Sequence, residues 1–134
     1  MLQVYPNAGL LEWLDRMLDD DLIYKLFVND ETPHADTILP DLTEASFSGY
    51  LAMTVAPADF VIRSVSGNIG TALAPPISFH NGGGSPTNVY GYYVVDPTGL
   101  ILLGAARFDD APIAIPADGY QQVTPILAND SLYK

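Results

Sequence analysis

After residue 21 the chain consists of short segments rich in β-forming residues, and the first of them, residues 22–28, nearly alternates apolar and polar side chains, as half-buried β-strands do. Turn-forming residues separate eight such segments, which lie at residues 22–28, 51–55, 60–65, 77–80, 89–95, 100–108, 112–115 and 120–127. Short strands at near-regular spacing are typical of sandwiches and small barrels. The pattern predicts a mainly β fold, a single antiparallel β-sandwich or jelly-roll-like barrel, with one N-terminal amphipathic helix.

Two turns are the clearest connections between the predicted strands. Asp96-Pro97-Thr98-Gly99 has proline second and glycine last, which favours a type I turn and a hairpin between the segments on either side. Gly67-Asn68 is a second turn signal. Residues 29–48 form the longest stretch without a clear strand or helix pattern, and one helical turn within 41–47 is expected there.

The predicted helix covers about 12 residues near the N-terminus and begins after Asn7 as N-cap. Its apolar side chains fall within one arc when plotted at about 100° per residue. These side chains are Leu10, Leu11, Trp13, Leu14, Met17 and Leu18. An apolar stripe of this kind must be covered, either by the rest of its own domain or by a neighbouring subunit.

The segment 29–48 is long for a compact domain, yet it carries apolar side chains that water disfavours leaving exposed. We expect this segment, the helix face and the tyrosine-rich strand to contact other subunits. The predicted interface residues are Leu10, Leu14, Met17, Ile38, Leu39, Leu42, Phe47 and Tyr92. In the alternative, the loop residues close one end of the β-domain, and a charge at Leu42 would then unfold the protein rather than prevent assembly.

Length and charge limit the functional classes. A chain of 134 residues suits one domain, predicted as a helical segment over residues 1–21 followed by a β-domain over residues 22–134. It has 16 acidic and 5 basic residues, for a net charge of −11. This balance disfavours binding to nucleic acid or to an anionic membrane surface, and no apolar run approaches the roughly 20 residues of a membrane span. The acidity serves solubility or docking onto a basic partner.

The sequence offers little catalytic chemistry. Cysteine is absent, and neither His34 nor His80 lies near a recognisable nucleophile motif. Gly82-Gly83-Gly84 lacks the lysine and the following helix of a phosphate-binding loop. Asp19-Asp20-Asp21 lacks the spacing of a calcium loop and fits the end of a helix better. We therefore expect no enzymatic activity, no catalytic residues, no cofactor and no metal.

A set of residues across positions 22–127 resembles a pattern found in small structural proteins of tailed bacteriophages. In the first half these are Leu26-Phe27-Val28-Asn29, Thr32-Pro33, Thr37, Asp41-Leu42, Glu44-Ala45, Phe47 and Gly49-Tyr50. In the second half they are Tyr90-Gly91-Tyr92-Tyr93-Val94, Asp96, Arg107-Phe108, Gly119 and Val123-Thr124-Pro125. The chain differs from the pattern at Pro75-Pro76 and at the three successive glycines. The resemblance implies a β-rich fold, attachment to a capsid or tail, and no enzymatic activity.

These observations lead to two functional hypotheses. The first is a capsid decoration or cement protein, made in the host bacterial cytoplasm and located in the virion. It would bind the outside of the shell, with the major capsid protein or other virion proteins as partners, and would form a homo-oligomer, expected to be a trimer. The alternative is a tail, baseplate or fibre-associated module that binds host glycan, favoured by Tyr90, Tyr92 and Tyr93 in one predicted strand beside a glycine-rich loop.

Overall fold

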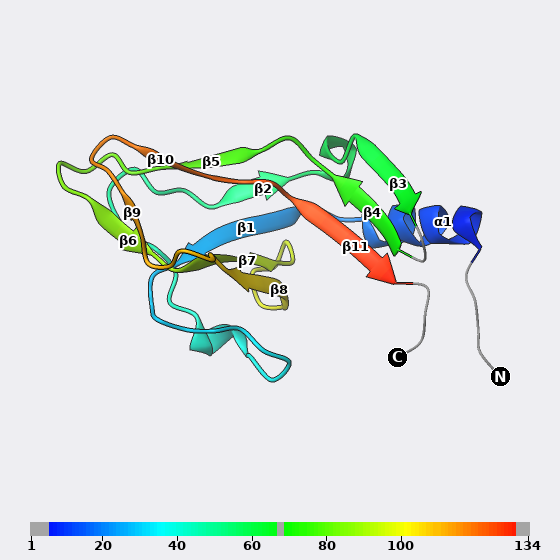
Figure 1. The fold of residues 1–134 in the computed structure, drawn as a ribbon, viewed down its shortest axis with the longest axis horizontal. Helices are drawn as coiled ribbons and strands as arrows, with labels where there is room; N and C mark the ends of the chain where they lie inside the picture. Colours follow the sequence, from blue (N-terminus) through cyan, green and yellow to red (C-terminus); the bar gives the residue numbers. More distant parts are fainter. Residues whose placement is uncertain (1–5, 67–68, 131–134) are drawn as a thin grey trace. The chain divides into compact units, whose positions relative to one another are not determined.

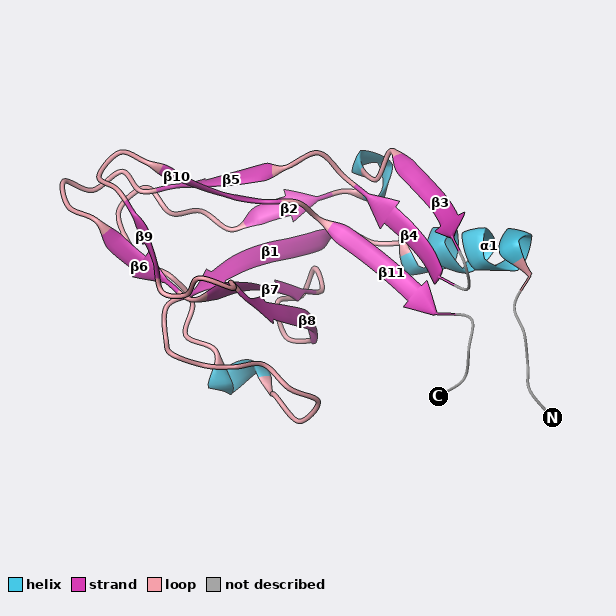
Figure 2. Cartoon of the chain, in the orientation of Figure 1, coloured by secondary structure: helices cyan, strands magenta, loops and turns pink. Residues whose placement is uncertain are grey.

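The computed structural model describes residues 6–66 and 69–130, which form mainly antiparallel β-structure with one α-helix near the N-terminus (Figures 1 and 2). The helix α1 spans Asn7–Met17, and two short 3₁₀ helices cover Leu39–Asp41 and Pro57–Asp59. The strands are β1 (Leu22–Phe27), β2 (Met53–Val55), β3 (Ile62–Ser66), β4 (Ile69–Leu73), β5 (Ile77–His80), β6 (Thr87–Val89), β7 (Gly91–Val95), β8 (Leu102–Arg107), β9 (Ile113–Ile115), β10 (Tyr120–Val123) and β11 (Ile126–Asp130).

The chain forms two compact units that interleave in sequence. Unit 1 contains the described residues of Met1–Asp21, Val55–Pro76 and Thr124–Lys134, and unit 2 contains Leu22–Thr54 and Ile77–Val123. The predicted N-terminal helical segment thus shares a unit with strands that lie much later in the chain. The organisation of the whole chain as a single domain stays a prediction.

In unit 1, α1 packs on a three-stranded antiparallel sheet with the strand order β11-β4-β3 (Figure 1). Leu10 and Leu14 are spaced by four residues, so they share one face of the helix, and both are buried together with Leu18, the residue that follows the helix. This packing on the chain itself is one of the two arrangements that the sequence allowed.

Small and charged side chains complete the face of this sheet that lies toward α1. Arg63 of β3 forms an ion pair with Asp15 of α1. Ala72 of β4 is the register partner of Arg63, so it lies on the same face, and it is fully buried. A small side chain at this position lets the helix approach the sheet closely.

The helix start differs by one residue from the prediction. Asn7 is the first helical residue rather than the N-cap, and the cap position is taken by Pro6 without a side-chain hydrogen bond. The Pro6 carbonyl accepts a 2.9 Å hydrogen bond from the Leu10 amide, which closes the first turn. At the other end Asp19, Asp20 and Asp21 follow the helix and are exposed.

Unit 2 contains three antiparallel sheets. The largest has the strand order β2-β1-β7-β8, and the two smaller ones pair β10 with β5 and β6 with β9. β1 pairs with β7 from Ile23 opposite Val95 to Phe27 opposite Gly91. In Figure 1, β7 and β8 run beside β1, with β8 at the sheet's outer edge.

The predicted hairpin at residues 96–99 is confirmed. The Gly99 amide donates to the Asp96 carbonyl at 2.9 Å, and Gly99 has a φ of +75°, which glycine adopts without strain. β7 and β8 flank this turn and pair in register from Gly91 opposite Arg107 onward. Val94 faces Gly104 and Val95 faces Leu102, so Leu103 is an extra residue at an irregularity of the ladder.

The core of unit 2 covers one face of the large sheet. Phe27, Leu42, Tyr93 and Val95 form a buried cluster. Partly buried apolar side chains pack around this cluster, namely Ile23, Leu39, Tyr90, Leu102 and Ala105. Leu39 and Leu42 come from the segment 29–48, so this segment covers part of the sheet's face.

The predicted strand pattern was wrong in three places. β4 was missed, the predicted strand 89–95 is interrupted at Tyr90, and the predicted strand 120–127 ends at Val123. Buried Pro125 separates β10 from β11, since proline has no amide hydrogen for a ladder. A helical turn is present in the long loop, but it lies at Leu39–Asp41 rather than within 41–47. The turn predicted at Gly67-Asn68 lies outside the described residues.

Candidate binding surface

The segment 29–48 is anchored at its base by one side chain. Asn29 donates from Nδ2 to the Asp41 carbonyl at 2.7 Å and accepts at Oδ1 from the Thr43 amide at 2.8 Å. The Val28 amide donates to the Thr43 carbonyl at 2.9 Å, which continues the pairing of β1 with the returning chain. The two ends of the loop are thereby held together.

Short-range hydrogen bonds also fix the conformation of the loop's interior. Asp41 Oδ2 accepts from the Ile38 amide at 3.0 Å and so caps the 3₁₀ turn. The Thr37 hydroxyl accepts from the His34 amide at 2.8 Å, and His34 Nδ1 accepts from the Asp36 amide at 3.2 Å. His34 thus has a local structural role in a turn. The loop is ordered by its own polar side chains before any partner binds.

The four interface residues predicted in this segment lie in different environments. Ile38 is 58% exposed at the start of the 3₁₀ turn, whereas Leu42 is 6% exposed and belongs to the core cluster. Leu39 is half-buried against that cluster, and half-buried Phe47 packs edge-on against Tyr50 at 5.3 Å between ring centroids. Leu42 therefore fits the alternative in which the loop closes the β-domain, and Ile38 is the side chain most available to a partner.

Tyr92 lies among other aromatic rings of unit 2. Its ring centroid is 6.0 Å from that of Tyr24 and 6.1 Å from that of Phe108, and Tyr92 is half-buried. Tyr93 points to the opposite face of the sheet and is buried, as the alternation predicts. Neighbouring side chains of the same unit therefore bury most of the surface of the Tyr92 ring.

Two of the predicted interface residues on the helix, Leu10 and Leu14, lie in the interior of unit 1. Leu10 and Leu14 are 1% and 0% exposed, so they fill the space between the helix and its sheet. Met17 is the last helical residue, and its side chain lies outside what the structure describes. Among the predicted interface side chains that the structure describes, Ile38 is therefore the most accessible.

A part-buried polar cluster links the end of the loop to β1. The Tyr50 hydroxyl donates to Glu44 Oε2 at 2.9 Å and accepts from the Leu26 amide at 3.2 Å. Lys25 pairs with Glu44 Oε1 at 3.3 Å. Burial raises the pKa of Tyr50 above its ordinary value; the Leu26 amide opposes this shift, and the Glu44 carboxylate adds to it. Tyr50 therefore stays a neutral donor and keeps Glu44 in place.

Alkaline unfolding of unit 2 is the expected consequence of its buried tyrosines. Burial raises the pKa of Tyr24 and of Tyr93 to about 12, whereas an unfolded tyrosine titrates near pH 10. The folded protein then holds more protons than the unfolded chain above roughly pH 10, so the free energy of unfolding falls as the pH rises through 10 to 12. Denaturant unfolding measured across this range should show a loss of up to about 1.4 kcal/mol per pH unit for each such tyrosine.

The conservative variant Tyr93→Phe provides the control for this pH dependence. It keeps the ring in the core and removes the titrating hydroxyl, so its stability should fall less steeply with pH. A phenolate absorbance titration in which all eight tyrosines ionise in one step near pH 10 would contradict the prediction.

A groove beside β8 forms the second feature of this surface. Its volume is about 280 Å³, and it opens to solvent between the loop and the outer strand of the large sheet. The lining residues are Pro33, His34, Thr37, Leu102, Leu103, Gly104 and Ala105. This groove was not predicted from the sequence. The signal for it was the unbroken apolar run from Leu100 to Leu103, because a strand that faces the core on one side needs an apolar residue only at every second position.

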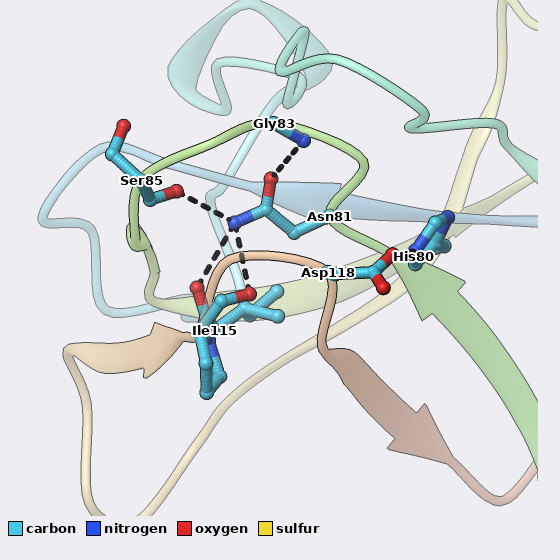
Figure 3. A network of polar contacts seen from close by, with 7 residues as sticks. His80, Asn81, Gly83, Ser85, Ile115 and Asp118 are labelled. Atoms are coloured by element: carbon cyan, nitrogen blue, oxygen red, sulfur yellow. Dashed lines mark hydrogen bonds and ion pairs between the residues drawn. The ribbon is translucent and has the colours of Figure 1, made fainter.

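A third feature is a polar network at the end of β5 (Figure 3). Asn81 is 1% exposed, and its Nδ2 lies 3.0, 3.0 and 3.1 Å from the carbonyls of Ser85, Ile115 and Pro116. Its Oδ1 accepts from the Gly83 amide at 3.0 Å. The side chain thus fixes the glycine-rich loop to the last residue of β9 and to the residue after it.

His80 lies next to this network and has neighbours of its own. Its Nε2 is 2.8 Å from Asp118 Oδ1, and its ring stacks on Tyr120 with 4.6 Å between centroids. Asp118 has a φ of +58°, and its side chain is 89% exposed. The opposite face of the Tyr120 ring is available to solvent, since this residue is 63% exposed.

The described residues contain no group of three or more histidine, aspartate or glutamate side chains placed to hold a metal ion. Across the same residues, no helix has the length and apolar character needed to cross a membrane. In comparisons with known proteins, no family model, no curated protein and no solved structure matches this chain.

Proposed function

We propose that this chain is a structural protein of a bacteriophage virion, and specifically a decoration or cement protein on the outside of the capsid. The observation that carries the proposal is the loop 29–48, which presents Ile38 to solvent on a hydrogen-bonded framework. A loop that is ordered before it docks loses little conformational entropy on binding. A rigid apolar contact repeated over a symmetric shell gains further strength from multiplicity.

The residues that carry the resemblance to phage structural proteins support this proposal, because several of them build the loop's framework. Asn29 holds the loop's base, Asp41 caps its 3₁₀ turn, and Glu44 bonds to Tyr50. Gly49 has a φ of +81° and approaches the backbone of Gly82, where a side chain would clash. The residues of the pattern thus fix the conformation of the loop, as expected if the loop binds another virion protein.

The partners in this proposal are the major capsid protein or other virion proteins, and the assembly is a homo-oligomer, most simply a trimer. The chain's net charge of −11 suits a basic partner surface. No enzymatic step is part of the proposed role.

We also propose that the sheets of unit 2 form an antiparallel β-sandwich or jelly-roll-like barrel. Tyr50 supports this arrangement because it joins two sheets of the unit. Its hydroxyl accepts from the Leu26 amide in β1, while its ring stacks on Phe79 of β5 with 6.0 Å between centroids.

The second candidate is a tail, baseplate or fibre module that binds host glycan, and the exposed Tyr120 ring favours it. Tyrosine rings offer an apolar face to sugars, and the neighbouring Asp118 carboxylate can accept hydrogen bonds from sugar hydroxyls. Binding of isolated host polysaccharide by the purified protein, lost in Tyr120→Ala, would favour this candidate over capsid decoration.

Replacing Ile38 with aspartate should leave the protein folded and abolish its attachment to virus particles. Ile38 is exposed, so the charge costs little in the free protein, whereas burying that carboxylate at a docked interface costs several kcal/mol, on the order of a thousandfold in affinity. Circular dichroism checks the fold, and co-sedimentation with particles lacking the protein checks attachment.

Leu51→Asp is the matched control, because Leu51 is 73% exposed in the same unit but outside the loop. It should attach like the parent protein. Attachment of Ile38→Asp at parental affinity would contradict the docking role of the loop, and localisation of the chain only in tails of imaged virions would exclude capsid decoration.

A further inference from the structure

We infer that the outer edge of β8 accepts an extended segment of another protein as an added antiparallel strand, and that this segment alternates apolar and basic side chains. The inference concerns a surface along β8 in unit 2, where the loop 29–48 supplies one wall of the groove but the side chain of Ile38 does not line it. It does not depend on a virion role.

The strand β8 is an edge strand with little of the usual protection. It pairs with β7 on one side only, so every second residue turns its amide and carbonyl groups away from the sheet. From Leu102 to Ala106 the strand has no charged residue and no proline, the residues that commonly block edge pairing. The irregularity at Leu103 affects one end and leaves Gly104–Arg107 in regular register with β7.

Exposed apolar side chains continue the edge into the β7–β8 turn. Leu100, Ile101 and Leu103 are 79%, 57% and 54% exposed, whereas Leu102 packs on the core cluster. Leu103 and Gly104 also line the groove beside the strand, and the loop residues Pro33, His34 and Thr37 form its other wall. An added strand would pair with the backbone of β8 and place alternate side chains in this groove.

The negative charge around the edge of β8 favours a basic segment as the added strand. Asp96 stands at the start of the hairpin, exposed Asp36 lies between the groove-lining residues His34 and Thr37 in the chain, and exposed Asp109 and Asp110 follow the strand's end. Thr98 and the amides of the turn bond to the Asp96 carboxylate and lower its pKa, so it is ionised at neutral pH.

The basic residues of unit 2 do not offset these acids. The unit has nine acidic and two basic residues. Lys25 pairs with Glu44, and Arg107 pairs with Asp30 at 2.6 Å, so both cations are already neutralised within the unit. A second copy docked edge to edge would bring like charges together, whereas a basic segment would meet complementary charge.

A synthetic peptide of alternating lysine and valine, with blocked ends, is the probe for this edge. We expect it to bind the full chain, and amides of β8 should gain protection from hydrogen exchange as they acquire a strand partner. The same peptide with N-methyl groups on alternate residues keeps its charge and side chains but cannot form the ladder, so it should not bind.

Two variants locate the contact. Leu103→Lys puts a charge of the peptide's own sign on the edge and should weaken binding by about tenfold or more, equivalent to about 1.4 kcal/mol. Leu51→Lys adds the same charge at an exposed position away from β8 and should bind the peptide within about twofold of the parent chain.

The inference is overturned if the N-methylated peptide binds equally, because charge alone then explains the binding. It is also overturned if no β8 amide gains protection, if the lysine–valine peptide does not bind, or if the chain instead forms a dimer that Leu103→Lys dissociates. Attachment of Ile38→Asp to particles is measured separately, so failure of the proposed function leaves this test intact.

Discussion

Replacing Gly91 with alanine should unfold unit 2 or destabilise it by about 3 kcal/mol or more. A Cβ atom at Gly91 would clash with the carbonyl oxygen of Ala106 and with the ring of Phe27. The carbonyl belongs to the paired strand β8, and Phe27 is fully buried in the core cluster, so neither neighbour can move without breaking the sheet or opening the core. Urea unfolding followed by near-ultraviolet circular dichroism measures the loss.

Gly104→Ala is the matched control, because it makes the same change in the neighbouring strand where nothing lies within 4 Å of the added Cβ. Its stability should equal or slightly exceed that of the parent protein, since alanine restricts the unfolded chain more than glycine does. Equal stabilities of the two alanine variants would contradict the close approach of Gly91 to Phe27.

Replacing Asn81 with aspartate should destabilise unit 2 by about 3–5 kcal/mol. The amide nitrogen of Asn81 faces three carbonyl oxygens, which share its two hydrogens (Figure 3). An aspartate oxygen in its place would leave these carbonyls without a donor and would set a negative charge against them in a buried position. Equilibrium denaturation at neutral pH measures the effect, and hydrogen exchange in the segment 82–86 should rise with it.

Asn88→Asp provides the comparison, because Asn88 is an exposed residue of β6. Its stability should stay within about 0.5 kcal/mol of the parent value. Asn81→Ala, which removes the donor without adding a charge, should lie between the two at a cost of about 2–3 kcal/mol. An aspartate at position 81 as stable as one at position 88 would show that the network does not hold the loop.

The sequence predicted correctly those turns and strands that are specified by residues next to one another in the chain. The proline and glycine of Asp96-Pro97-Thr98-Gly99 specify the β7–β8 turn without help from the rest of the fold, and the predicted strand at Ile77–His80 is β5. β4 was missed because Gly70 and Ala72 are poor strand formers. Both residues are buried, and close packing within unit 1 requires small side chains at these two positions. That packing is a tertiary requirement that no window of the sequence reveals.

The candidate surface was less predictable than the fold, for a related reason. In the sequence, Ile38, Leu39 and Leu42 are alike as apolar residues of a loop. In the structure, the turn capped by Asp41 leaves Ile38 exposed and Leu42 in the core. The edge position of β8 depends on the strand order β2-β1-β7-β8, which follows from pairing between distant segments. Exposure and edge position are properties of the assembled sheet, so they emerged only from the structure.

The interleaving of the two units has a consequence for how the chain folds as it is synthesised. α1 is the first described element to be made, but β11, which completes the sheet beneath it, begins about 110 residues later at Ile126. At typical translation rates that interval lasts on the order of 10 s. During this interval the sheet that buries Leu10, Leu14 and Leu18 is incomplete. Unit 1 is therefore the part of the nascent chain that would most need a chaperone.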